Sequence, residues 1–259
     1  MPEDERLRPY SWRMDTFMVP PGALQGRAVT LSGAEARHAF AAARVREGDR
    51  VRLIDGEGAE AVAAVRRVRG GEASLVVVDR RTRTRDEGVT LTVAQSIPKG
   101  RGMDEVVRRC AELGVASIVP VTTERTVVRL RGDSAERRVG RWRSVAVAAT
   151  KQSRGVFVTS VAEPADLSGL RPMLGASDLA VVAWEEEGGV TLREALRGEV
   201  PRDIVAVVGP EGGLSETEIA SLGEAGAVPV TLGSRVLRSD WAAAALAAAV
   251  SYELGGLLP

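Results

Sequence analysis

Cysteine and histidine are nearly absent from this sequence of 259 residues, which contains only Cys110 and His38. A lone cysteine cannot form an internal disulfide, and with one histidine it cannot complete the usual ligand set of a zinc site. The scarcity also argues against a Ser-His-Asp triad in the carboxyl-terminal half. We therefore expect chemistry that needs no metal.

Long hydrophobic runs are also missing. The longest, Trp241 to Val250, is about half of the roughly 20 residues that a membrane-spanning helix needs. Residues Met1 to Asp15 are polar and charged, which favours a frayed amino terminus over a signal peptide or a membrane anchor. These features predict a cytoplasmic protein that does not bind membranes.

The sequence has no excess of charge of either sign, because 35 Lys and Arg residues balance 35 Asp and Glu residues. A neutral total argues against indiscriminate nucleic-acid binding, but it leaves local basic patches open. Aromatic residues make up 3% of the chain. Alanine, valine and leucine must therefore fill most of the interior.

The length and the pattern of the chain favour two domains. From Phe17 to about Asp79, short apolar alternations broken by glycine and proline turns predict a compact β-meander or barrel, with one helix at Gly33 to Val45. The stretch from Arg80 to Gly88 is charged and free of apolar residues, which is typical of a solvated linker. We place the domain boundary in this stretch.

From Val89 onward, apolar strands alternate with amphipathic helices, which indicates an α/β domain with a mostly parallel sheet. Helices are expected between the first two strands, from Ser134 to Ser153, and from Asp240 to Leu254. In the first of these, Cys110 falls on the apolar face and is interpreted as core. The expected strands are Thr90 to Ile97, Ser117 to Val121, Asp178 to Ala183, Ile204 to Val208 and Val228 to Leu232.

Two glycine-bearing turns between strand and helix are candidates for a ligand site. GPEGGLSETE, from Gly209 to Glu218, follows the strand that ends at Val208, and its Ser215 and Glu218 match a helix-capping box. The turn lacks the spacing of a P-loop or of a dinucleotide fold, and Glu211 would repel phosphate, so a neutral or cationic adenosyl ligand fits better. The second turn, GSRVLRSDW from Gly233, would open at the same carboxyl edge of the sheet.

These segments together resemble the RsmE-type 16S ribosomal RNA (uracil-N3) methyltransferases of the SPOUT class over nearly the whole chain. Order and spacing both agree. One difference is Arg238-Ser239-Asp240-Trp241, where relatives usually carry Arg-Thr-Glu-Thr. The matching segments are FMVPPGAL from Phe17, His38 to Asp49, IPKGRGMDEVVRRCAELGVASIVPVTTERTVV from Ile97, Arg141-Trp142, Gln152-Ser153, GPEGGLSETE, and Leu232 to Arg238.

The resemblance implies a PUA-like β-barrel at residues 16–80 that helps bind RNA, and a SPOUT α/β domain with a trefoil knot at residues 89–259. It also implies a homodimer packed through the knotted region, and 16S ribosomal RNA of the small ribosomal subunit as the substrate. S-adenosyl-L-methionine is the implied cofactor. The implied cofactor-binding residues are Ala183, Trp184, Gly209, Glu211, Gly212, Gly213, Leu232, Gly233, Val236, Leu237 and Ser239.

Uracil N3 carries a proton and is a poor nucleophile until that proton leaves. Arg238 and Arg235 are the candidates to stabilise the developing negative charge. Asp240 is a candidate base, with helix capping as the alternative explanation. Arginines that could contact RNA phosphates, or could be ordinary surface charges, are Arg44, Arg46, Arg101, Arg125 and Arg129.

Three other functions stay open at this point. Loops that bind a cofactor do not encode the target base, so a SPOUT methyltransferase for another RNA site is possible. A non-catalytic RNA-binding ribosome assembly factor could keep the fold. A small-molecule nucleotide enzyme would not need the amino-terminal domain.

Overall fold

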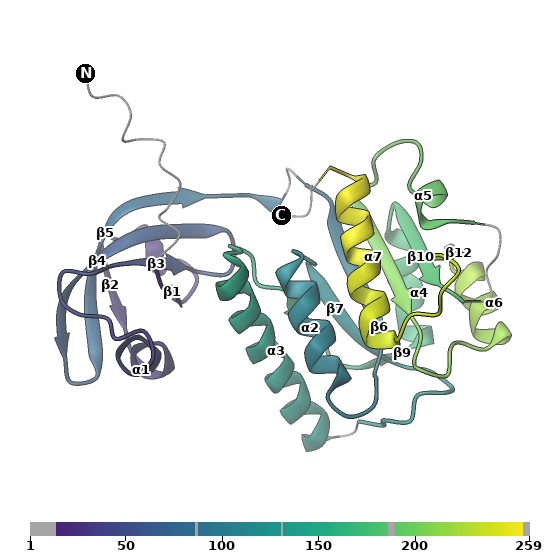
Figure 1. Cartoon of the computed structure of the whole chain (residues 1–259), viewed down its shortest axis with the longest axis horizontal. Helices are drawn as coiled ribbons and strands as arrows, with labels where there is room; N and C mark the ends of the chain where they lie inside the picture. The colour runs from purple at the N-terminus through teal and green to yellow at the C-terminus, as the bar shows by residue number, and fades with distance from the viewer. Residues whose placement is uncertain (1–13, 86–87, 131, 186–189, 256–259) are drawn as a thin grey trace. The chain divides into compact units, whose positions relative to one another are not determined.

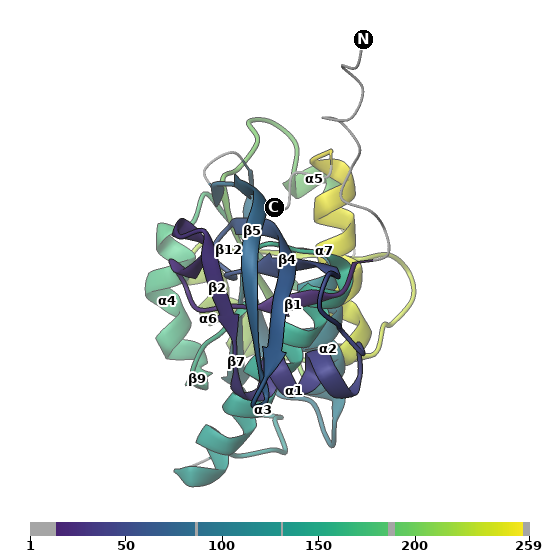
Figure 2. The same ribbon diagram turned by 90° about the vertical axis from the view of Figure 1, so that its left-hand side faces the viewer.

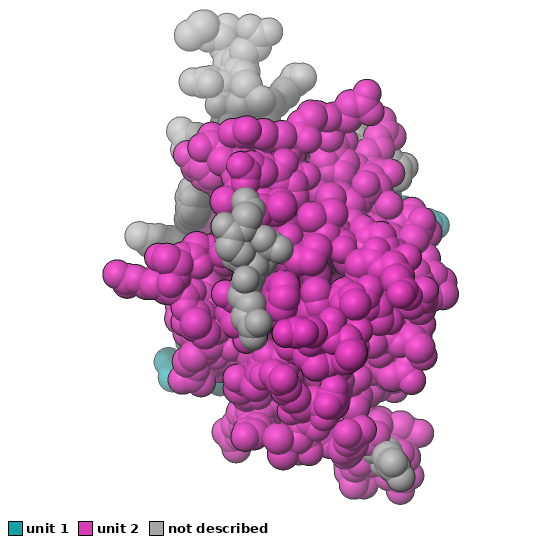
Figure 3. All heavy atoms as spheres, turned by 90° about the vertical axis from the view of Figure 1, so that its right-hand side faces the viewer, with its two compact units in different colours: residues 1–84 teal, residues 85–259 magenta. Residues whose placement is uncertain are grey.

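The computed structural model describes residues 14–85, 88–130, 132–185 and 190–255. The chain divides into two compact units, residues 1–84 and residues 85–259 (Figure 3). The expectation of a frayed amino terminus falls mostly on residues 1–13, which lie outside the described residues. Residues 86–87 of the expected linker and residues 256–259 lie outside them as well.

The first unit is a five-stranded sheet with the order β1-β3-β4-β5-β2, together with one α-helix (Figure 2). β1 pairs in parallel with β3, and the other pairings are antiparallel. Phe17, Leu53 and Leu75 are buried in its own core. The elements are β1 (Thr16–Met18), η1 (Ala23–Gln25), β2 (Ala28–Leu31), α1 (Gly33–Ala41), β3 (Arg50–Ile54), β4 (Ala59–Arg69) and β5 (Glu72–Thr82).

The prediction of a linker from Arg80 to Gly88 is wrong at its beginning, because β5 continues to Thr82. Arg81 pairs with Glu60 in the ladder and Thr82 pairs with Ala59. The Arg80 guanidinium donates a hydrogen bond of 2.7 Å to the carbonyl oxygen of Gln25. Charged side chains that remain solvated do not prevent backbone pairing, which is why composition alone misplaced the end of this strand.

The second unit contains a seven-stranded sheet with the order β12-β10-β11-β6-β7-β8, in which β9 also pairs with β7. All of these pairings are parallel. The predicted α/β class with a mostly parallel sheet is therefore confirmed. The strands are β6 (Thr90–Ser96), β7 (Ser117–Thr122), β8 (Ser160–Val161), β9 (Ala165–Asp166), β10 (Leu179–Ala183), β11 (Asp203–Val208) and β12 (Ala227–Val230).

Helices cover both faces of this sheet. On one face α2 (Gly102–Glu112) lies between α3 (Asp133–Ser153) and α7 (Ser239–Glu253), as Figure 1 shows. On the other face, α4 (Leu167–Ala176) and α6 (Glu216–Glu224) pack over a second apolar core. The short α5 (Leu192–Ala195) contacts β12.

Cys110 is fully buried on α2, as the apolar spacing predicted. Burial raises the pKa of its thiol to about 12, so the thiol stays neutral and acts as a small apolar side chain. Among the described residues, no helix combines the length and apolar character that crossing a membrane requires.

The path between β12 and α7 brings the two glycine-bearing turns together. β12 lies beyond β10 at the edge of the sheet, whereas α7 packs against β6, β11 and α2. Residues 231–238 must therefore cross the carboxyl ends of β10 and β11 before α7 begins. The second turn consequently lies beside the first one.

Candidate functional site

A cavity of about 270 Å³ lies at the carboxyl ends of β10, β11 and β12. The bends that begin at Gly209 and Gly233 both line it, as expected from the sequence. β10 lies between β11 and β12, and its end contributes the wall between the two bends. The lining residues are Ala183, Trp184, Glu185, Val208, Gly209, Pro210, Glu211, Gly213, Thr231, Leu232, Gly233, Arg235, Val236, Leu237, Arg238, Ser239 and Ala242.

Of the predicted cofactor-binding residues, only Gly212 does not line the cavity. Its carbonyl oxygen instead accepts a hydrogen bond of 2.7 Å from the Arg125 guanidinium. Arg125, one of the predicted RNA contacts, therefore also holds the first glycine turn. Trp184 packs against the apolar core that α4 and α6 cover, and it also lines the cavity.

The first glycine turn is fixed at both of its ends. Ser215 and Glu218 form the predicted capping box at the start of α6, with reciprocal hydrogen bonds between side chain and backbone. The Glu211 carboxylate accepts a hydrogen bond of 2.9 Å from the backbone N–H of Lys99. Gly213 has a φ of 71°, in the left-handed region that favours glycine.

A buried polar chain joins the two turns beneath the cavity. The Ser239 hydroxyl donates a hydrogen bond of 2.6 Å to the carbonyl oxygen of Gly209. It accepts one of 2.9 Å from the Gln95 side-chain amide. Gln95 lies at the end of β6 and is fully buried. The ends of β6 and β11 and the start of α7 are thereby held together.

Arg235 and Arg238, the predicted cationic residues, both line the cavity, whereas Asp240 does not. The Asp240 carboxylate accepts hydrogen bonds of 3.1 and 3.3 Å from the Arg238 guanidinium. The N-cap residue of α7 is Arg238, which makes no side-chain capping bond, and Asp240 lies in the first turn of the helix. Its side chain is 13% exposed, against 81% for that of Arg238, so a partly buried carboxylate holds an exposed guanidinium.

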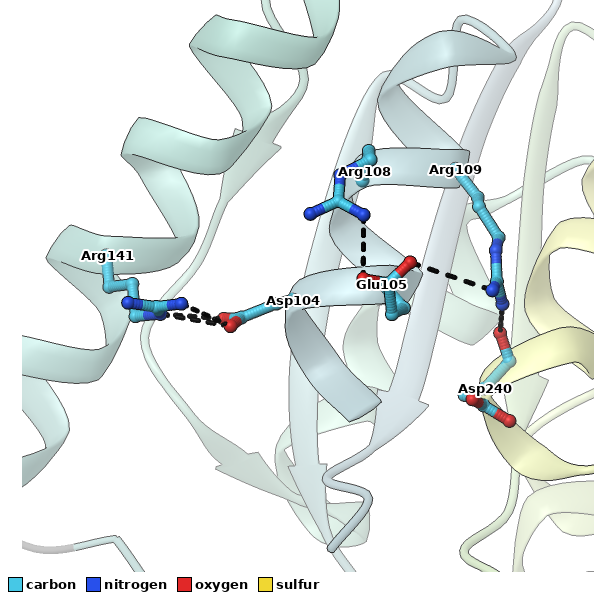
Figure 4. A network of polar contacts seen from close by, with 6 residues as sticks. All are labelled: Asp104, Glu105, Arg108, Arg109, Arg141 and Asp240. Atoms are coloured by element: carbon cyan, nitrogen blue, oxygen red, sulfur yellow. Dashed lines mark hydrogen bonds and ion pairs between the residues drawn. The ribbon is translucent and has the colours of Figure 1, made fainter. Parts of the chain in front are cut away.

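α2 lies beside the start of α7 and contacts it (Figure 4). The Arg109 guanidinium donates a hydrogen bond of 2.9 Å to the carbonyl oxygen of Asp240, and it lies 4.1 Å from the centre of the Trp241 ring. Glu105 pairs with Arg109 on the same helix. Trp241 thus stacks on an arginine, and about half of its surface stays exposed.

The predicted RNA-contacting arginines are all exposed. Arg44 and Arg46 lie in the first unit, and Arg101, Arg125 and Arg129 lie in the second. Arg44 has a φ of 54°, an unusual backbone conformation for a residue other than glycine.

Sequence reasoning missed Glu185, Gln95 and Arg109. Glu185 directly follows Ala183 and Trp184, which were expected to lie close to the ligand at the end of a strand. This position in the sequence could have identified Glu185 as a candidate site residue. In the sequence, nothing distinguishes Gln95 from other strand residues or Arg109 from other helix residues. Their partners are 144 and 131 positions away in the sequence.

Comparison with known proteins identifies the relatives of the chain. Residues 85–251 match the family model of an RNA methyltransferase domain, and residues 31–81 match that of an RNA methyltransferase PUA domain. The chain is 32% identical to ribosomal RNA small subunit methyltransferase E of Mycobacterium bovis over 232 residues, which cover 87% of this chain and 86% of that protein. It is 29% identical to the protein of the same name from Bacillus subtilis, over 86% of this chain and 90% of that one.

A solved structure agrees with these sequence matches. The crystal structure of ribosomal RNA small subunit methyltransferase E from Neisseria gonorrhoeae, bound to S-adenosyl methionine, superposes with a TM-score of 0.81. Sequence identity is 30%, and the match covers 92% of this chain and 97% of that chain.

Proposed function

The chain belongs to the ribosomal RNA small subunit methyltransferase E family, and on that premise we propose that it methylates N3 of one specific uridine in 16S ribosomal RNA with S-adenosylmethionine. The observation that carries the proposal is that both glycine-bearing turns line one and the same cavity at the carboxyl ends of β10, β11 and β12. α/β proteins bind their ligands at this edge of the sheet.

The residues present fit an adenosyl cofactor. The cavity volume of about 270 Å³ is close to the lower end of the range of small-molecule pockets, about 300 Å³. Its walls combine apolar side chains such as Val208 and Leu232 with glycine backbone, which offers N–H and C=O groups without a side chain in the way. Except for Gly212, the residues that the sequence suggested, from Ala183 to Ser239, would hold the cofactor.

When bound, the cofactor supplies an electrophilic methyl group on a sulfonium. The turns at Gly209 and Gly233 orient this group and exclude water, a contribution that can reach roughly 7 to 11 kcal/mol of a barrier. Arg238 and Arg235 stabilise the negative charge that develops on the uracil when N3 loses its proton. Asp240 keeps Arg238 in place and remains the carboxylate candidate for accepting that proton.

Finer features of the family belong to the same proposal. We propose that residues 16–80 form a PUA-like β-barrel that holds RNA with Arg44 and Arg46, and that residues 89–259 form a SPOUT domain. Arg101, Arg125 and Arg129 would meet RNA phosphates on that domain. The crossing of residues 231–238 over β10 and β11 supports a trefoil knot.

We also propose a homodimer packed through α7. Trp241 and Tyr252 on this helix are 53% and 86% exposed, and Ala248 and Ala249 are exposed between them. Small side chains allow a second helix to approach closely. Assembly with 16S ribosomal RNA in the small subunit would occur in the cytoplasm.

The test is transfer of labelled methyl groups to ribosomal RNA from a strain that lacks the enzyme. Naked RNA and isolated small subunits are compared, and the labelled nucleotide is mapped. We expect label at N3 of one uridine, with small subunits as the better substrate. Label in neither preparation would contradict the substrate, and label at a different atom would favour another RNA site.

A further inference from the structure

Four charged side chains line the cavity: Glu185, Glu211, Arg235 and Arg238. Two of them are engaged within the protein, since Arg238 pairs with Asp240 and Glu211 accepts a hydrogen bond from Lys99. Glu185 and Arg235 have no hydrogen-bond or ion-pair partner in the described parts of the chain. An unpaired carboxylate therefore faces the proposed cofactor site.

Glu185 lies directly against Gly213. A Cβ atom added to Gly213 would collide with the Oε1 atom of Glu185. The carboxylate thus occupies the space that the missing side chain of Gly213 leaves. The end of β10 and the first glycine turn lie next to each other, and the Glu185 carboxylate therefore lines the cavity wall between them.

We propose that Glu185 is the counter-ion for the positively charged end of the cofactor, an inference that rests on the proposed function. S-adenosylmethionine carries a sulfonium, an ammonium and a carboxylate group at its methionyl end, which gives this end a net charge of +1, whereas its adenosine part is neutral. The Glu185 side chain is exposed at the cavity wall, and a cation bound against it excludes some of the water that would otherwise screen the pair.

Other ligands fit Glu185 less well. A carboxylate repels RNA phosphate, so the substrate backbone is not its partner. No group of three or more His, Cys, Asp or Glu side chains suited to a metal ion occurs among the described residues. The cofactor's cationic end is the partner whose charge complements this position.

The experiment is isothermal titration calorimetry on the full-length protein with S-adenosylmethionine and with 5′-methylthioadenosine. The second compound keeps the adenosine and the sulfur but has neither positive charge. Glu185→Gln keeps the shape of the side chain and removes its charge. We expect it to weaken S-adenosylmethionine binding roughly three- to tenfold and to change methylthioadenosine binding less than twofold.

Glu216→Gln is the matched control, because Glu216 is an exposed carboxylate of α6 that does not line the cavity. It should leave both affinities unchanged. S-adenosylhomocysteine, which keeps the ammonium and lacks the sulfonium, tells the two cationic groups apart. Weaker binding of S-adenosylmethionine alone indicates the sulfonium, and weaker binding of both amino-acid-bearing compounds indicates the ammonium.

Equal weakening of all three compounds would show that Glu185 only shapes the pocket, and no change in any of them would show that it does not contact the cofactor. Either result would overturn the inference. If Glu185→Gln does not fold, salt provides a second measurement on the unaltered protein. S-adenosylmethionine affinity should fall with ionic strength and methylthioadenosine affinity should not, and equal salt responses would contradict the proposal. An unaltered protein that binds none of these compounds would instead contradict the proposed function.

Discussion

Gly213 meets two demands that no other residue meets at its position. Its φ of 71° costs an L-residue about 1 to 2 kcal/mol, and its open Cα face admits the Glu185 carboxylate. We predict that Gly213→Ala lowers the free energy of unfolding by about that amount and weakens S-adenosylmethionine binding at least tenfold. Calorimetry and chemical denaturation measure the two effects.

The control is Gly223→Ala in α6, where an added Cβ meets no atom within 4 Å. This change should stabilise the helix by about 0.5 to 1 kcal/mol and leave cofactor affinity alone. Normal affinity in Gly213→Ala would mean that the cofactor does not depend on this bend.

Asp240 can act in two ways: as the base that the sequence suggested, or as the residue that positions Arg238, a role that its contact with Arg238 adds. Its carboxylate holds the exposed Arg238 guanidinium, so Asp240→Asn should release Arg238 while the cavity walls stay in place. We predict a fall of roughly tenfold in the rate of methyl transfer, with S-adenosylmethionine affinity within twofold of the unaltered protein. Single-turnover transfer and calorimetry provide the two numbers.

The pH profile of Asp240→Asn distinguishes positioning from proton transfer. If Asp240 only positions Arg238, the variant keeps the shape of the profile at a lower rate, whereas loss of the acidic limb would identify Asp240 as the base. Asp240→Glu should restore most of the rate, because it retains the charge. An unchanged rate in Asp240→Asn would exclude both roles.

Ser239 connects three elements through one hydroxyl group, from Gln95 on β6 to Gly209 at the end of β11. Removing the hydroxyl leaves the partly buried Gly209 carbonyl without this donor and the buried Gln95 amide without this acceptor, at a cost of about 1 to 3 kcal/mol. Ser239→Ala should therefore lower thermal stability and weaken cofactor binding, since both turns lose their common support. Ser234→Ala, on the exposed part of the second turn, should change neither quantity by more than about 0.5 kcal/mol. A Ser239→Ala protein as stable as the unaltered one would show that the hydroxyl does not hold the turns.

The sequence could predict elements whose signal is local. The strand expected at Ile204 to Val208 is observed as β11, and the helix expected at Ser134 to Ser153 as α3, each shifted by one residue at its start. Apolar periodicity and the capping box contain this information within a few residues. Ala183 and Trp184 line the cavity between the two turns, and they were predicted from the resemblance to the family, not from periodicity.

Contacts between distant segments could not be predicted in this way. The parallel pairing of β1 with β3 joins Thr16 to Arg52, and neither strand indicates its partner. Arg81 and Thr82 have the composition of a linker, but pairing with β4 makes them strand. Glu185 matters only because the fold places Gly213 beside it. Each of these features depends on a contact between segments that are distant in the sequence, and a local sequence pattern contains no information about such contacts.

The two units divide the proposed work between them. Residues 14–84 contain 12 arginines and 9 acidic residues, so the first unit carries a positive excess in a chain whose total charge is +0. Positive charge of this kind favours contact with a phosphate backbone. The cavity, in contrast, is lined only by residues of the second unit.

This division predicts what happens when the first unit is removed. Each unit has a buried core of its own, so residues 85–259 should fold alone and bind S-adenosylmethionine with the affinity of the full chain. Transfer of labelled methyl to small subunits should fall at least a hundredfold, because the unit proposed to hold RNA is gone. Circular dichroism verifies folding, calorimetry measures the cofactor, and filter binding measures RNA affinity. Full transfer activity in the shortened protein would contradict an RNA-holding role for the first unit and would favour a substrate small enough to be bound by the second unit alone.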